Sequence, residues 1–92
     1  MSDDIKSITD ERGKNYGHPK KHFLCTQTMY AAWIESRDKA EPLEDAEKEA
    51  AYRHGVYMII DKLARMSENP LHKDNIDDIQ GYARCMWMIL GD

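Results

Sequence analysis

The sequence predicts an all-α fold, a small bundle of three main helices with a short N-terminal helix. Apolar residues recur every three or four positions, as they do on one face of a helix. No stretch shows the strict apolar–polar alternation of a half-buried strand, and prolines and glycines stand between the periodic segments. We therefore expect a single helical domain over residues 1–92, completed by association with further copies of the chain.

The first half of the chain is expected to form a short helix, a basic loop and one long helix. Residues 3–12 carry two isoleucines three positions apart and two early aspartates, which favour a helix start. The loop 13–18 follows at a glycine. Pro19 suits the first turn of a helix over 19–37. The spacing of Phe23, Gln27, Tyr30 and Ile34, with Thr26 and Trp33 beside them, indicates a helix rather than a strand.

The second half is expected to form two further helices. Pro42 predicts the start of a helix over 42–68, and Asn69-Pro70 ends it. Asp74, with Asp77 three residues later, resembles a capping box at the start of a helix over 75–91. The expected apolar edge of this last helix is Ile76, Ile79, Ala83, Met86, Trp87 and Leu90.

Length, charge and cysteine content restrict the classes of function. A chain of 92 residues buries only about 60–65% of the surface that its unfolded form exposes, so its core is marginal. The net charge of -4 argues against general nucleic-acid binding, which needs a basic face. Two isolated cysteines and an acidic N-terminus predict a reducing cytoplasm, and no apolar run reaches the roughly 18 residues of a membrane span.

Two helical segments are apolar on almost every side, which predicts a homo-oligomer. They are Gly55–Ile60 and Tyr82–Leu90. A helix that is apolar all round must be buried on all sides, and a three-helix monomer cannot provide that cover. The cluster of Met86, Trp87 and Met88 is accordingly interpreted as core rather than as a ligand cage.

The segment from Arg12 to His22 has the composition of an anion-binding loop. It combines cationic side chains with two glycines, and it leads into a helix N-terminus whose free N–H groups attract phosphate. The alternative is a solvated basic turn in front of a helix. If the loop binds a nucleotide, Tyr16 or His22 is expected to stack on the base. The candidate ligand-binding residues of this segment are Arg12, Lys14, Tyr16, His18, Lys20 and His22.

A second candidate is the charged group that follows the apolar part of the 42–68 helix. Asp61 and Arg65 are four residues apart and can form an ion pair, which is a purely structural explanation. Lys62 and Arg65 are three residues apart and are also expected to share a face, so that both reach the phosphates of a ligand. The two interpretations are compatible.

Carboxylates form a third candidate, a tentative Mg²⁺ site that applies only if the protein is a hydrolase. Its ligands would be Asp61, Asp74, Asp77 and Asp78. The alternative is that aspartates near a helix start only stabilise the helix. Glu44 and Glu47 are interpreted as surface residues. No cofactor is otherwise indicated: the four histidines lack zinc-ligand spacing, and among them His54 is expected to be an interior residue.

Three motifs, in this order, resemble a family of short helical proteins of phages and prophages. They are Arg12-Gly-Lys14-x-Tyr16-Gly17-x-Pro19-x-x-x-Phe23, Lys62-x-x-Arg65, and His72-x-Asp74-x-x-Asp77-Asp78-Ile79-x-Gly81-Tyr82-Ala83. The family is similar to nucleotide-modification-associated helical domains, and the resemblance covers about residues 11–83. His18 and His22 stand where the family pattern has Asp and Asn. The resemblance implies an all-α fold and a viral setting.

A more distant similarity is to the MazG-like nucleoside triphosphate pyrophosphatases, which hold Mg²⁺ with E-x-x-E on one helix and E-x-x-D on the next. This chain offers only Asp61 at a suitable depth on the facing helix, so hydrolysis ranks below binding. The leading hypothesis is a non-catalytic nucleotide-binding phage protein in the host cytoplasm that sequesters cyclic nucleotide signals of anti-phage immunity. The alternatives are a Mg²⁺-dependent MazG-like pyrophosphatase and a protein-binding inhibitor of a host factor.

Overall fold

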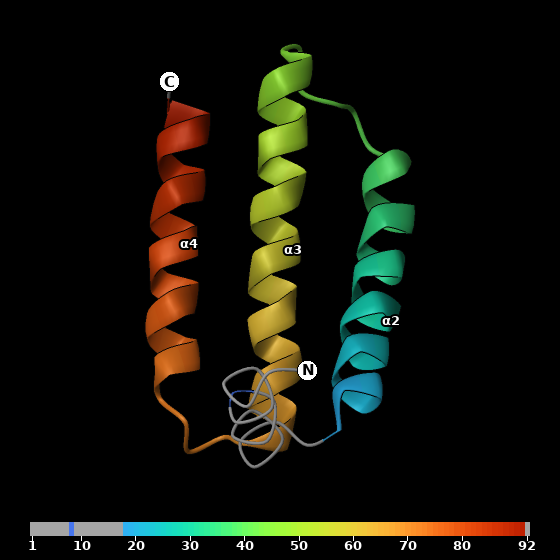
Figure 1. The fold of residues 1–92 in the computed structure, drawn as a ribbon. Coiled ribbons are helices and arrows are strands. Elements are labelled where there is room, and N and C mark those ends of the chain that lie inside the picture. Colours follow the sequence, from blue (N-terminus) through green and yellow to red (C-terminus); the bar gives the residue numbers. More distant parts are fainter. Residues whose placement is uncertain (1–7, 9–17, 92) are drawn as a thin grey trace.

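The protein is a single layer of three helices with the longest one in the middle. The computed structural model describes residue 8 and residues 18–91, and this part of the chain contains no strand. Its helices are α2 (Pro19–Asp38), α3 (Ala46–Glu68) and α4 (Asp74–Gly91). α3 packs against both neighbours, whereas α2 and α4 do not touch each other (Figure 1). The all-α prediction is confirmed, and the predicted helix 3–12 lies outside the described residues except for the helical Ile8.

α2 begins at Pro19, as predicted. His18 precedes it as the N-cap, where its Nδ1 atom accepts a hydrogen bond from the backbone N–H of Lys20 at 3.1 Å. His22 and Thr26 are buried against α3, whereas Phe23 is 62% exposed. Asp61 on α3 fixes this rotation of the helix, because its carboxylate contacts both His22 and Thr26.

α3 begins at Ala46 and not at Pro42. The Asp45 carboxylate accepts hydrogen bonds from the backbone N–H groups of Glu47, at 2.9 Å, and Lys48, at 3.1 Å, which makes Asp45 the N-cap. This side-chain cap determines the helix start more strongly than the proline does. The helix ends at Glu68, before Asn69-Pro70, as expected.

α4 begins one residue earlier than predicted, and Asp74 is its first helical residue rather than its cap. The carbonyl oxygen of Lys73 accepts the first helical hydrogen bonds, from the N–H of Ile76 at 3.0 Å and of Asp77 at 3.2 Å. The expected capping box is therefore wrong. Within the part of the chain that the structure describes, no helix is long and apolar enough to cross a membrane.

The layer has almost no apolar interior. Among residues 18–91 and Ile8, the only buried hydrophobic residues are Ile60 and Ala64, both on α3. Trp87 is 71% exposed and Met88 is 55% exposed, so the expectation that they form core is wrong for a single chain. The reason is topological: a single layer of helices leaves both broad faces open.

α3 and α4 approach closely at Gly55, and a groove runs beside this contact. A Cβ atom at Gly55 would lie 2.6 Å from Cγ of Met86, so only glycine leaves room for the methionine. The groove has a volume of about 430 Å³ and is almost entirely apolar. His54 lines it and is exposed, so the expectation of an interior histidine is wrong. The remaining lining residues include Ala51, Met58, Tyr82, Cys85 and Ile89.

Replacing Gly55 by alanine is expected to lower the free energy of unfolding by about 1 kcal/mol, because Met86 must leave its rotamer or α4 must shift. The matched control is Gly81→Ala on α4, where an added Cβ meets nothing within 4 Å. That variant should raise the free energy of unfolding by up to about 1 kcal/mol through helix propensity. Urea denaturation of both variants measures the difference, and equal effects would contradict the close approach of α3 and α4.

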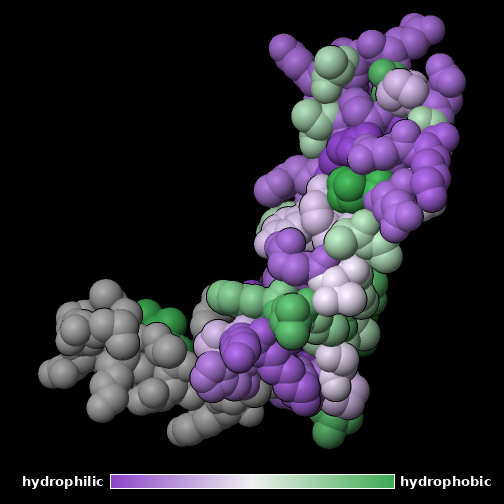
Figure 2. Space-filling model, turned by 90° about the vertical axis from the view of Figure 1, so that its right-hand side faces the viewer, coloured by the Kyte–Doolittle hydropathy of each residue, from purple (hydrophilic) through white to green (hydrophobic). Residues whose placement is uncertain are grey.

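A network of ion pairs joins the C-terminal end of α2 to the N-terminal end of α3. Nε of Arg37 donates to Glu49 at 3.0 Å, Nε of Arg53 donates to the same carboxylate at 2.9 Å, and the Leu43 N–H adds a bond at 2.8 Å. Chiefly because of the Arg37 hydrogen bond, the pKa of Glu49 falls to about 2. Figure 2 looks onto the α2 edge and shows hydrophilic residues gathered at this end, with apolar residues nearer the middle.

This network makes a pH-dependent contribution to stability. Because the folded-state pKa of Glu49 lies below its unfolded value of 4.5, its contribution is complete above about pH 4.5 and is lost as the pH falls towards 2. Glu49→Gln should therefore destabilise the protein clearly at pH 6 and much less at pH 2.5. Urea denaturation at both pH values measures this, with the exposed Glu47→Gln as control. A Glu49→Gln effect that is independent of pH would contradict the assignment.

Candidate functional site

The centre of the candidate site is a hydrogen-bonded histidine–aspartate pair between α2 and α3. Nε2 of His22 lies 3.0 Å from Oδ1 of Asp61, and the two residues are 39 positions apart in the sequence. The His22 side chain is 5% exposed and that of Asp61 is 16% exposed, so the pair lies largely out of water. A contact of this kind fixes the rotation of α2 on α3.

Two further side chains hold the Asp61 carboxylate in place. The Thr26 hydroxyl lies 3.3 Å from Oδ1 and is placed to donate to it, and also lies 3.1 Å from the His22 carbonyl oxygen. Nε of Arg65 donates to Oδ2 at 3.1 Å. The predicted Asp61–Arg65 pair is thus confirmed. Both carboxylate oxygens have partners, which keeps a buried charge compensated.

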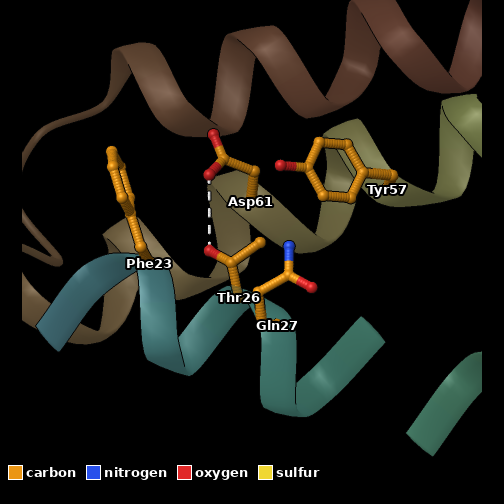
Figure 3. A pocket seen from close by; sticks show the side chains of 5 residues that line it. All are labelled: Phe23, Thr26, Gln27, Tyr57 and Asp61. Atoms are coloured by element: carbon orange, nitrogen blue, oxygen red, sulfur yellow. Dashed lines mark hydrogen bonds between the residues drawn. The ribbon is translucent and has the colours of Figure 1, made fainter. Parts of the chain in front are cut away.

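A small pocket opens beside this carboxylate. It has a volume of about 260 Å³, and two aromatic rings and three polar side chains line it. Figure 3 shows Thr26 and Gln27 rising from α2, with the Tyr57 hydroxyl directed toward Asp61 and Phe23 on the other side of Asp61. We call this the α2–α3 pocket, and it is lined by Phe23, Thr26, Gln27, Tyr57 and Asp61.

One face of α2 leads from the pocket to the start of the helix. Lys20, Phe23 and Gln27 have the spacing i, i+3 and i+7, which places them on a common side of a helix. Lys20 is exposed and forms no ion pair with the described residues, whereas Lys21 pairs with Glu68 at 3.1 Å. The first turn of α2 contains no acidic residue. An unpaired cation at a helix N-terminus is a favourable position for an anion.

The predicted basic residues are distributed over several places. Arg12, Lys14 and Tyr16 lie outside the described residues. Lys62 pairs with Asp78 of α4 at 3.0 Å, whereas Arg65 holds Asp61 on the side of α2. The two cations are thus held by different carboxylates: Lys62 reaches across to α4, whereas Arg65 pairs within α3, and their joint role in binding phosphates stays a prediction.

The sequence-based roles of the two histidines also change. Either Tyr16 or His22 was expected to stack on a base; His22 is buried against Asp61 and supports the carboxylate. His18 caps α2 through its Nδ1 atom. Phe23, a member of the predicted helical stripe, is the exposed ring at the pocket.

The four candidate metal ligands are not brought together. Asp61 lies between α2 and α3, whereas Asp78 pairs with Lys62, and Asp74 and Asp77 are exposed. Oδ2 of Asp74 lies 3.7 Å from Nε2 of His72. Within the described ranges, no three His, Cys, Asp or Glu side chains lie close enough to hold one ion. The described residues therefore provide no cluster of three carboxylates at the start of α4, where Asp78 is engaged by Lys62 of α3.

Sequence reasoning missed most of the pocket lining. The sequence indicated no binding role for Thr26, Gln27 or Tyr57. A signal was present: His22 and Thr26 are polar residues four positions apart, in a helix that otherwise offers large apolar side chains. Polar residues on the buried face of a helix require polar partners on the helix that they face. On α3, the charged residue directly after the apolar segment Gly55–Ile60 is Asp61.

Comparison with known proteins gives the family but no activity. The model of the family described as Domain of unknown function (DUF6378) matches residues 2–90. The "Gene 55 protein" of Mycobacterium phage D29 is 32% identical over 79 residues, which cover 86% of this chain and 45% of that protein. The chain thus spans less than half the length of this relative. No solved structure matches. The chain belongs to the DUF6378 family, a phage protein family of unknown function.

Proposed function

We propose that this member of the DUF6378 family binds a nucleotide in the α2–α3 pocket and holds it without turnover. The observation that carries the proposal is the exposed ring of Phe23 beside hydrogen-bonding groups of Gln27, Tyr57 and Asp61. A nucleobase needs such a combination, because its face stacks on aromatic rings while its edge exchanges hydrogen bonds.

The size and charge of the pocket support a base rather than a whole nucleotide inside it. Its volume of about 260 Å³ is just below the range of about 300–1,000 Å³ that encloses drug-sized ligands. The phosphates would therefore lie outside, along the face of α2 that carries Lys20. The positive end of the helix dipole and the Lys20 ammonium favour a negative group there. Arg12 and Lys14, which precede α2 in the sequence, are the further phosphate ligands that we propose.

The chemistry of Asp61 favours recognition over hydrolysis. His22, Thr26 and Arg65 occupy its carboxylate oxygens, so its remaining lone pairs suit an N–H group on the edge of a base. We propose that the protein acts in the host cytoplasm by lowering the concentration of a free nucleotide. Cyclic nucleotide signals of anti-phage immunity are the ligand class that such a phage protein would profit from removing.

Equilibrium dialysis against a panel of linear and cyclic nucleotides tests the proposal. The expected result is saturable binding of at least one nucleotide, and weaker binding of the corresponding base without phosphates. If every nucleotide distributes equally across the membrane, the proposal fails. In that case the exposed apolar faces of the layer favour the alternative function, the binding of a host protein.

A further inference from the structure

The side of α4 that faces away from the α2–α3 pocket carries a regular stripe of residues. Ile76, Gln80, Ala83, Trp87 and Leu90 are spaced by four, three, four and three positions, which is the spacing of a heptad seam between two helices. We call this set the α4 stripe. It is distinct from the side of α4 that packs on α3, where Met86 meets Gly55 and Tyr82 lines the groove beside this contact.

The α4 stripe lies on the broad face of the layer opposite to the face on which the α2–α3 pocket opens. Ala83 is two residues from Cys85, and at about 100° per residue the two side chains point to opposite sides of α4. Cys85 and His54 both line the apolar groove. His54 lies seven residues, or two helical turns, from Asp61 and therefore on the same side of α3, so the groove and the α2–α3 pocket open on one face of the layer. Leu63, two residues after Asp61, lies by the same argument on the side of the stripe and is 44% exposed.

The exposed apolar area of this face is large for a chain with so little core. Trp87 is 71% exposed, Leu90 47% and Ile76 42%. With Leu63, these side chains offer on the order of 400 Å² of apolar surface, about half of the roughly 800 Å² per partner of a stable interface. A layer of helices needs a second layer over its apolar face, and in residues 18–91 only Ile60 and Ala64 are buried hydrophobic residues.

We infer that a second copy of this chain packs on the α4 stripe, with the two stripes facing each other across a two-fold axis. The stripe suits self-association because it is nearly symmetric about the small residue Ala83: Ile76 and Leu90 lie seven positions to either side, so that each would face the other in an antiparallel contact. A two-fold contact uses the same patch on both copies, so one apolar stripe is sufficient. This arrangement leaves both α2–α3 pockets open on the outer faces.

The test compares two variants at neighbouring exposed positions. Sedimentation velocity should show that the parent chain is a dimer or a multiple of two, across a dilution series. Trp87→Glu should weaken association at least about 30-fold, because a central tryptophan is a typical hot spot. Met88→Glu is the matched control: Met88 is also apolar and 55% exposed but points away from the stripe, so association should be unchanged. A monomeric parent chain, or equal effects of the two variants, would overturn the inference.

Cross-linking tests the same contact without a disruptive substitution. In a chain with Cys25→Ser and Cys85→Ser, the variant Ala83→Cys should form a disulfide-linked dimer on mild oxidation, because the centre of the stripe faces its own copy. A chain that keeps Cys85 and carries only Cys25→Ser should remain unlinked, since Cys85 lies on the groove side. Linkage through Cys85 in preference to position 83 would place the interface on the opposite face and overturn the inference.

Discussion

Replacing Asp61 by alanine is expected to lower the free energy of unfolding by about 3 kcal/mol. Its carboxylate is the common partner of three largely buried groups, of His22, Thr26 and Arg65. Removal of this shared acceptor breaks all three contacts at once in a largely buried setting, which is more costly than the loss of an exposed pair.

Urea denaturation at equal protein concentration measures the effect, since association would otherwise change the apparent stability. The matched control is Asp38→Ala. Asp38 is 59% exposed and its partner Arg53 keeps a second carboxylate, Glu49, so the expected loss is below about 1 kcal/mol. If the two aspartate variants lose the same stability, Asp61 does not organise the contact between α2 and α3.

Replacing Phe23 by alanine is expected to weaken nucleotide binding by about 5- to 150-fold, while leaving the stability of the protein nearly unchanged. The magnitude follows from the stacking of a base on an aromatic side chain, about 1–3 kcal/mol per base. The effect on stability is small because Phe23 is 62% exposed in the folded protein. Equilibrium dialysis with the nucleotide that the parent protein binds measures the loss.

The matched control is Leu24→Ala. Leu24 is 63% exposed, like its neighbour Phe23, but it does not line the α2–α3 pocket. Its removal should leave the affinity within a factor of two. A comparable loss of affinity in both variants, or none in the Phe23 variant, would place the ligand elsewhere.

Helix positions followed from the sequence because they depend on local signals. Pro19 opens α2 as expected, and Asn69-Pro70 ends α3. Pro42 was misleading, since proline is equally suited to a connection, and Asp45 supplies the cap that starts α3. Apolar periodicity also predicted helices correctly but not which side of each helix faces its neighbour, as Phe23 and Trp87 show.

The candidate site depended on contacts that local patterns do not contain. The Asp61–Arg65 pair was predictable because both residues lie on one helix, four positions apart. Its connection to His22 spans 39 residues and follows from the packing of α2 on α3. Lys62 and Arg65, three positions apart, pair with carboxylates of different helices, and the partner of Lys62 follows from the packing of α4 on α3.

The measurement that tests the central claim most directly is the recovery of the ligand. The purified protein is incubated with Mg²⁺ and its tightest-binding nucleotide, free ligand is removed, the protein is denatured by heat, and both fractions are chromatographed. Binding without turnover predicts an intact nucleotide that is released only on denaturation. A converted nucleotide in the free fraction, absent from a control without protein, would contradict the claim and identify an enzyme.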